Sequence, residues 1–98
     1  LQSSSSLKKL CLDNNEITDL GCKHLAMVLQ SSTGLEELIL EGNDITSEGV
    51  KLLSLALQLN TSLIRLSLNY NEIGDDGLIH LSTMLKVNST VSILHLDT

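Results

Sequence analysis

The sequence of 98 residues has almost no aromatic side chains and no proline. Phenylalanine and tryptophan are absent, and Tyr70 is the only aromatic residue. Hydrophobic residues still make up 42% of the chain, and leucine supplies more than half of them. A compact chain of this length buries only about two thirds of its unfolded surface. A core made of leucine without large aromatic residues therefore indicates at most one domain, built from a repeated unit.

Basic residues are also few. Six lysines and arginines face twelve aspartates and glutamates, which gives a formal net charge of -6. Nucleic-acid binding depends on clustered lysine and arginine, and here the basic residues are scattered. The composition argues against nucleic acid as the main partner.

The two cysteines, Cys11 and Cys22, are too few for a disulfide framework and lack metal-binding spacing. This favours a reducing compartment, and we expect a cytoplasmic protein. No segment approaches the run of about 20 apolar residues that a membrane-spanning helix needs, and no secretory leader is visible. We therefore expect no membrane partner. The first residue is Leu1 rather than methionine, so we expect the natural start to lie elsewhere.

The sequence repeats itself every 28 residues without a gap. Apolar residues recur in three columns, which are Leu7, Leu35, Leu63 and Val91, then Leu10, Leu38, Leu66 and Leu94, then Leu12, Leu40, Leu68 and Leu96. The same shift aligns Asn15 with Asn43 and Asn71, and Gly21 with Gly49 and Gly77. The chain thus divides into the end of one repeat (1–6), three full repeats (7–34, 35–62 and 63–90) and the strand of a fourth (91–98).

Each repeat reads as a strand followed by a helix. The first part follows the pattern LxxLxLxxNxI, whose inner alternation is typical of a strand. In the second part Gly21, Leu25, Val28 and Leu29 have the spacing of a helix with one buried stripe. Helix starts, with side chains that satisfy first-turn N–H groups, are expected at Thr18-Asp19, Thr46-Ser47 and Gly74-Asp75. The glycine in that turn is expected to let helix and strand approach closely.

The three segments LKKLCLDNNEI, LEELILEGNDI and LIRLSLNYNEI resemble leucine-rich repeats of the ribonuclease-inhibitor type. The resemblance covers essentially the whole chain and implies an α/β fold, a right-handed solenoid with a parallel sheet on the concave face and helices on the convex face. The uniform units look most like the repeat domain of NOD-like receptors or related intracellular scaffolds. Because neighbouring repeats must stack to bury their leucines and no capping segment is visible, we expect a fragment of a longer solenoid, or a designed fragment.

Residues between the core leucines of each strand are expected to point into the concave groove, because side chains alternate between the two faces. They form three columns, which are Lys9, Glu37, Arg65 and Ile93, then Cys11, Ile39, Ser67 and His95, then Asp13, Glu41, Asn69 and Asp97. The first column can pair as a charge ladder. Asp13 and Glu41 have no partner in their own column, so a basic ligand would relieve their repulsion. Tyr70 is the kind of amphipathic side chain that anchors interfaces.

The predicted partner-binding residues on this face are Lys9, Asp13, Glu37, Ile39, Glu41, Arg65, Ser67, Asn69, Tyr70, His95 and Asp97. A solvated face without a partner is the alternative. On the convex side Leu52, Leu55, Leu59 and Ile79 form a second candidate patch, with packing between adjacent helices as the alternative. The residues predicted to be structural are Asn15, Asn43, Asn71, Gly21, Gly49 and Gly77.

Catalytic and cofactor chemistry finds no support in the sequence. Ser67 and His95 are neighbours in one column, but Asp97 lies roughly 7 Å along the strand, too far to orient the histidine ring. His24 and His80 are two repeats apart and cannot share a metal. We therefore expect no enzymatic activity, no cofactor and no metal.

Two segments, Asn60-Thr61-Ser62 and Asn88-Ser89-Thr90, are formal N-glycosylation acceptors. Both fall in the turn from helix to strand, where asparagine, serine and threonine are favoured for their own hydrogen bonds. Turn chemistry is the preferred interpretation, and a secreted glycoprotein is the alternative.

These observations together predict a protein–protein interaction module that presents a concave surface, within an intracellular sensor or an assembly scaffold. Two alternatives remain. One is a GTPase-activating protein of the Ran type, for which the repeats offer no identifiable catalytic residue. The other is a structural spacer in a large, for example ciliary, assembly.

Overall fold

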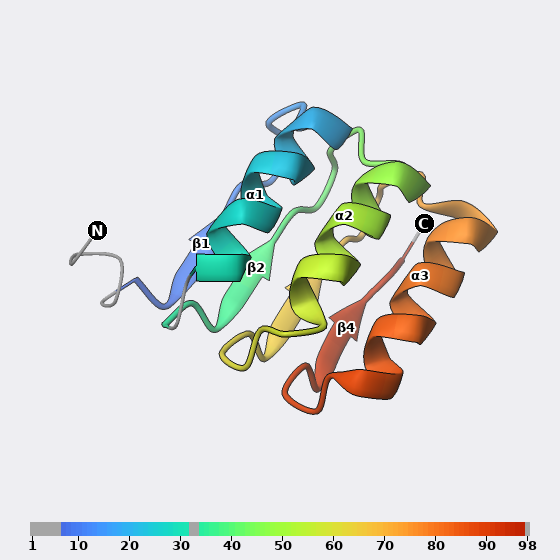
Figure 1. The fold of residues 1–98 in the computed structure, drawn as a ribbon. Coiled ribbons are helices and arrows are strands. Elements are labelled where there is room, and N and C mark those ends of the chain that lie inside the picture. The colour runs from blue at the N-terminus through green and yellow to red at the C-terminus, as the bar shows by residue number, and fades with distance from the viewer. Residues whose placement is uncertain (1–6, 32–33, 98) are drawn as a thin grey trace.

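The computed structural model describes residues 7–31 and 34–97, and it consists of three strand–helix units and a further strand (Figure 1). The predicted repeat end at residues 1–6 lies outside the described part. The elements in chain order are β1 (Lys9–Cys11), α1 (Asp19–Ser31), β2 (Glu37–Ile39), α2 (Ser47–Leu57), β3 (Arg65–Ser67), α3 (Gly74–Val87) and β4 (Ile93–His95).

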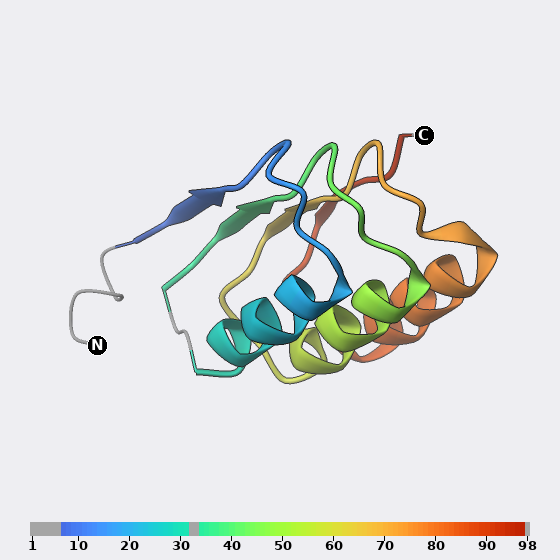
Figure 2. The ribbon, with the colours of Figure 1, turned by 90° about the horizontal axis from the view of Figure 1, so that it is seen from above.

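The four strands form one parallel sheet in the order β1-β2-β3-β4. Lys9 pairs with Glu37, Glu37 with Arg65, and Arg65 with Ile93, so every step across the sheet is 28 residues. Figure 2 shows the strands in one layer and the helices in the other. The α/β solenoid predicted from the 28-residue period is therefore confirmed. The first two predicted columns are lateral neighbours on the sheet, and the third lies two residues beyond the ends of the strands.

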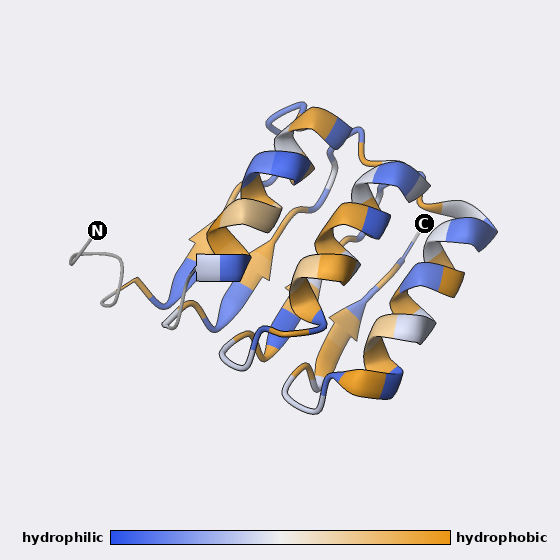
Figure 3. Cartoon of the chain, in the orientation of Figure 1, coloured by the Kyte–Doolittle hydropathy of each residue, from blue (hydrophilic) through white to orange (hydrophobic). Residues whose placement is uncertain are grey.

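The core lies between the sheet and the helix layer. Leu38 and Leu66 in the inner strands, and Leu40 and Leu68 just after them, are at most 1% exposed. Each helix is amphipathic (Figure 3). Cys22 is fully buried in the same core. Burial, and secondarily the negative charge of Asp19, raise the pKa of the Cys22 thiol to about 12. Cys22 therefore stays protonated and packs as a small apolar residue.

Side-chain capping of the helix starts differs from the prediction. The Thr46 side chain caps its own helix α2 by accepting from the Glu48 N–H at 3.3 Å. α3 has no side-chain cap bond. The Asp19 carboxylate serves the next helix, because Oδ1 accepts from the Thr46 N–H at 2.9 Å and the Gly49 N–H at 3.1 Å. Adjacent helices begin side by side, so a carboxylate in the first turn of α1 reaches the free N–H groups of α2.

The close approach at the glycine column also differs from the prediction, because it does not involve a strand. A Cβ at Gly21 would lie 2.6 Å from Cγ2 of Ile17, in the loop that precedes the helix. A Cβ at Gly49 would lie 2.5 Å from Asp19 Oδ1 and 3.0 Å from Cys22 Sγ, both on the neighbouring helix α1. The glycines therefore let each helix start pack against its own loop and, at Gly49, against the preceding helix.

The asparagine column joins consecutive repeats where the chain leaves the sheet. Asn43 Oδ1 accepts from the backbone N–H groups of Asn15 and Ile17, at 2.9 and 3.0 Å. Asn71 Oδ1 accepts from the Ile45 N–H at 3.1 Å, and its amide donates to the Leu40 carbonyl at 2.8 Å. Each of these side chains satisfies backbone groups of the preceding repeat that no strand or helix pairs.

A second asparagine column closes the turns from helix to strand. Asn60 donates to the Leu29 carbonyl at 2.9 Å and accepts from the Leu63 N–H at 2.8 Å. Asn88 repeats the arrangement by donating to the Leu57 carbonyl and accepting from the Val91 N–H. Both asparagines are only 7% exposed. The turn interpretation of the two N-x-S/T sequences is thus confirmed, because the amide nitrogen that would carry a sugar is buried and hydrogen-bonded.

Candidate protein-binding surface

The first column of the sheet face carries one ion pair. Arg65 Nη1 lies 3.4 Å from Glu37 Oε1, and both side chains are 37% exposed. Lys9 is exposed and, within residues 7–31 and 34–97, takes part in no ion pair. The predicted ladder is therefore a single surface pair, which contributes at most about 1 kcal/mol, and it leaves the Lys9 ammonium available.

The second column is less open than predicted. Ile39 is 6% exposed and Ser67 is fully buried, whereas Cys11 on the edge strand β1 is exposed. β2 and β3 are inner strands with a neighbour on each side, so short side chains on them are covered. The Ser67 hydroxyl donates to Glu41 Oε2 at 2.7 Å. The Ser67 hydroxyl thus donates to a carboxylate and not to His95, its lateral neighbour in the sheet.

The third column contradicts the expectation that its acidic side chains have no partner. Asp13 Oδ1 accepts from the Glu41 N–H at 2.9 Å. Glu41 Oε2 accepts from the Asn69 amide at 3.2 Å as well as from Ser67, and Asn69 Oδ1 accepts from the Asp97 N–H at 2.7 Å. The strands have ended at this level, so side chains take up the backbone N–H groups that the sheet leaves free. Asp97 is the member of this column that is both exposed and without a side-chain bond in the described part.

Tyr70 projects from this surface beside the third column. Its side chain is 61% exposed, and its backbone has φ of 61°, in the left-handed region that residues other than glycine seldom adopt. The Tyr70 N–H donates to the Asp97 carbonyl at 2.7 Å, which holds the turn in this conformation. The fold thus fixes the backbone of a residue whose large amphipathic side chain is mostly exposed.

Sequence reasoning missed a broader charge pattern at the edge of the molecule where strands end and helices begin. Ten of the twelve acidic residues lie there, and no lysine or arginine does. We call this set the acidic rim; it comprises Asp13, Glu16, Asp19, Glu41, Asp44, Glu48, Glu72, Asp75, Asp76 and Asp97. The signal was available in the sequence, since the residue after the repeated asparagine is acidic in all three repeats, at Glu16, Asp44 and Glu72.

The convex patch forms only in part. Leu55 is 53% exposed, Leu59 is 89% exposed and Ile79 is 60% exposed. Leu52 is only partly buried and packs against the core. The inter-helix packing alternative therefore holds for Leu52, while the other three residues remain open to solvent.

Two further properties constrain the site. In the part of the chain that the structure describes, no group of three or more His, Cys, Asp or Glu side chains is placed to hold a metal ion. Over the same residues, no helix has the length and apolar character that crossing a membrane requires.

Stacked strand–helix units with leucine columns between two layers define a leucine-rich repeat protein, a class that typically serves as a protein-interaction module. The chain belongs to the leucine-rich repeat family, whose model, described as "Leucine Rich repeat", matches residues 3–26, 31–54 and 59–82. No curated protein matches the chain.

Among solved structures the chain is similar to "Leiomodin-1 Actin-Binding Site 2 (ABS2)", with a TM-score of 0.87 and 23% sequence identity. The match covers 96% of this chain and 56% of that chain, so the present chain spans little more than half of its neighbour. At this identity the likeness concerns the fold.

Proposed function

We propose that this chain is a protein-binding module whose sheet face and acidic rim receive a basic surface of a partner protein. The observation that carries the proposal is the segregation of charge, with ten acidic residues and no basic residue along one edge. A surface of one sign attracts a surface of the opposite sign and accelerates the encounter between them.

The rim contains carboxylates that the fold does not use. Glu16, Asp44 and Glu72 are exposed, and their side chains form no hydrogen bond or ion pair within the described residues. Asp13 and Glu41, by contrast, are engaged in the hydrogen bonds between repeats. The exposed carboxylates are therefore the ones that a basic partner would contact, with Tyr70, two residues before Glu72, as an apolar anchor.

The cellular setting is the second part of the proposal. We infer a cytoplasmic module within an intracellular sensor of the NOD-like receptor kind or an assembly scaffold. It is supported by the resemblance of the uniform 28-residue units to such proteins and by two free cysteines, of which Cys11 is exposed. The similar solved structure is that of an actin-binding site of leiomodin-1, so actin is included as one partner in the assay.

The experiment compares two variants with the same change of net charge. Asp44→Asn with Glu72→Gln removes two negative charges from the rim, and Gln30→Lys with Thr61→Lys adds two positive charges at exposed sites away from it. Each protein, together with Tyr70→Ala, is used to capture partners from cytosol and is titrated against purified actin. We expect the rim variant and Tyr70→Ala to weaken binding about tenfold, and the binding of the wild type to fall with added salt.

The control variant is expected to bind like the wild type. Equal losses for the rim variant and the control would indicate a general charge effect, which contradicts a localised surface. Full binding by the rim variant and by Tyr70→Ala would contradict the proposed surface and leave the exposed convex residues Leu55, Leu59 and Ile79 as the candidate contact.

A further inference from the structure

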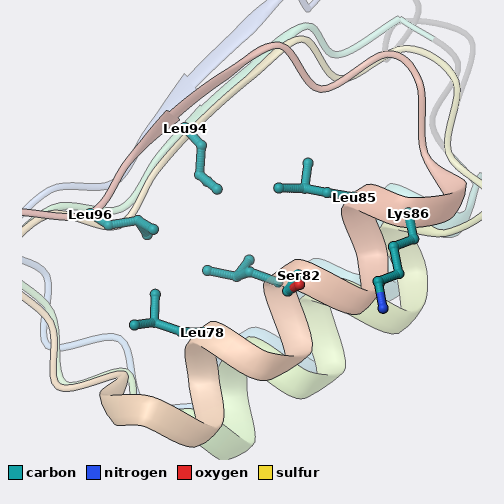
Figure 4. A pocket seen from close by; sticks show the side chains of 7 residues that line it. Leu78, Ser82, Leu85, Lys86, Leu94 and Leu96 are labelled. Carbon is teal, nitrogen blue, oxygen red and sulfur yellow. The ribbon is translucent and has the colours of Figure 1, made fainter.

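The exposed apolar side chains of the helix layer fall into two groups. In α3, Leu78 and Leu85 line an apolar pocket of about 400 Å³, and Figure 4 shows them pointing toward the side of Leu94 and Leu96. These side chains belong to the space between helix and sheet. The second group lies on the outer side of the helices and does not line this pocket. We call it the convex apolar face; its members are between 53% and 89% exposed, and they are Met27, Leu55, Leu59, Ile79 and Val87.

The 28-residue period brings the members of this face together. Met27 and Leu55 occupy the same position in consecutive repeats, and so do Leu59 and Val87. α1 packs against α2 and α2 against α3, and Figure 1 shows the three helices side by side. Leu55 and Leu59 are four residues apart, so they lie on the same side of their repeat. The convex apolar face therefore crosses all three helices.

Packing within the fold does not account for these apolar residues. Thr83 occupies the position of Leu55 in its own repeat, and Ser31 occupies the position of Leu59. Both polar side chains are exposed, and each donates to a backbone carbonyl of its own helix, at 3.0 and 3.2 Å. The repeat thus accepts a polar residue at either position. Clustered apolar side chains that the fold does not require indicate a contact surface.

The charged residues around the convex apolar face are of one sign. Acidic residues of the three helices are confined to the first turns, which belong to the acidic rim. After the first turn every charged residue is basic, and these are Lys23, Lys51 and Lys86. All three lysines are exposed and form no ion pair within residues 7–31 and 34–97. Unpaired ammonium groups beside exposed apolar side chains are complementary to a partner that is both apolar and acidic.

The spacing of the face fits an α-helix. Packed helices lie about 8–10 Å apart, which sets the separation of Leu59 from Val87. Residues four positions apart on a helix, such as Leu55 and Leu59, differ by about 6 Å along its axis. An amphipathic helix presents apolar residues at i, i+4 and i+7, which are about 6 and 10 Å apart along its own axis. Such a helix can therefore contact the apolar residues of neighbouring repeats at once.

An anionic membrane also combines negative charge with an apolar interior, but it fits this chain less well. The net charge of -6 and the acidic rim oppose approach to an extended anionic surface. A single helix can avoid the rim. Val87, at the end of α3, lies eleven residues after Asp76 of the rim, or about 16 Å along the helix axis. This separation is about twice the Debye length at physiological salt.

We propose that the convex apolar face binds an acidic amphipathic helix of a partner protein. Apolar side chains of that helix pack on Leu55 and Leu59, and the carboxylates that flank them pair with the three lysines. The chain then has two contact surfaces of opposite charge. The assignment is independent of the partner proposed for the acidic rim.

The probe is a fluorescein-labelled synthetic peptide of about 18 residues, long enough as a helix to cross three helices. It carries leucine at positions i, i+4, i+7 and i+11, with glutamate and alanine elsewhere. One control peptide has serine in place of leucine, and the other has the same residues in scrambled order. Fluorescence anisotropy measures binding to the 98-residue chain in about 50 mM salt. We expect the first peptide to bind at least about tenfold more tightly than either control.

Substitutions that copy the chain's own repeats locate the apolar contact. Leu55→Thr with Leu59→Ser introduces the residue types that Thr83 and Ser31 supply at the same positions. The fold should therefore be kept, which circular dichroism checks. Binding of the acidic peptide should fall about tenfold, because the exposed leucines supply its apolar contacts.

A matched pair of charge variants tests the lysines. Lys23→Gln with Lys51→Gln should weaken binding of the acidic peptide severalfold at low salt and have little effect at high salt. Lys8→Gln with Lys9→Gln removes the same charge from exposed lysines at the start of β1 and should leave binding nearly unchanged.

Three outcomes would overturn the proposal. The first is no binding of the acidic peptide, or equal binding by the wild type and the variant with Leu55→Thr and Leu59→Ser. The second is sedimentation of the chain with vesicles of phosphatidylcholine and phosphatidylserine while no peptide binds, which would assign the face to a membrane. The third is a dimer of the chain that the same variant dissociates, which would assign the face to a second copy.

Discussion

Replacement of the three equivalent asparagines by alanine should give unequal losses of stability, although all three occupy the same position of the repeat. Asn71 is 7% exposed and bonds four backbone groups, which are the Ile45 N–H and the carbonyls of Leu40, Leu68 and Asn69. Asn71→Ala leaves at least the Ile45 N–H and the Leu40 carbonyl buried without partners. Each such group costs about 1–3 kcal/mol, so we expect a loss of about 3 kcal/mol.

Asn15 provides the matched control. It is exposed, and its side chain makes one bond, to the Asp13 carbonyl of its own turn at 3.1 Å. Asn15→Ala should therefore cost about 0.5 kcal/mol. Asn43→Ala should come close to Asn71→Ala, because Asn43 is 5% exposed and accepts from two backbone N–H groups.

Urea unfolding followed by helical circular dichroism measures these losses, since the chain has no tryptophan to follow. With a slope of about 2 kcal/mol per molar urea, Asn71→Ala should lower the midpoint by about 1.5 M and Asn15→Ala by about 0.3 M. Loss of a cooperative transition in Asn71→Ala would count as the larger effect. Equal shifts for Asn15→Ala and Asn71→Ala would refute the argument that the asparagines act by satisfying buried backbone groups of the preceding repeat.

Two further predictions concern the helix layer. Because the Cys22 pKa rises from 9.0 to about 12 on folding, the unfolded chain loses this proton first above pH 9, and stability should fall between pH 9 and 12. Urea midpoints at pH 8 and pH 10.5 should show a smaller fall for Cys22→Ala than for the wild type. Gly49→Ala should destabilise by about 2–3 kcal/mol because its Cβ meets Asp19 and Cys22. Gly74→Ala has open space and costs only about 1 kcal/mol for φ of 64°; a larger loss at Gly74 than at Gly49 in thermal melts would contradict this.

The repeat period made the fold predictable in detail. A strict spacing of 28 residues dictates which residues become lateral neighbours, and the observed pairing of Lys9 with Glu37 and of Glu37 with Arg65 follows from it. The alternation of core leucines also identified the face on which the three columns lie. Periodicity therefore specifies strand order, register and core without any knowledge of side-chain conformation.

The roles of individual polar side chains could not be read from the period. The Ser67 hydroxyl is buried and donates to Glu41, and the direction of a long side chain such as that of Glu41 depends on the hydrogen-bonding groups near it. Asp19 was assigned to its own helix, yet its carboxylate bonds the start of the next one. Partner binding by the predicted sheet-face residues stays a prediction. Within the acidic rim, the carboxylates without a hydrogen-bond partner in the described residues, such as Glu16, Asp44 and Glu72, are the ones that we expect a partner to contact.

The hydrogen bonds between repeats run in both directions along the chain. Asn43 and Asn71 accept hydrogen bonds from backbone N–H groups of the repeat before them, whereas Asp13 and Asp19 accept from backbone N–H groups of the repeat after them. A force that pulls the two ends of the molecule apart thus loads the bonds at the sheet edge, the helix starts and the core at once. The interface between two repeats should therefore resist stretching until the contacts at the sheet edge, at the helix starts and in the core break together. The array would then extend by whole repeats rather than by gradual opening.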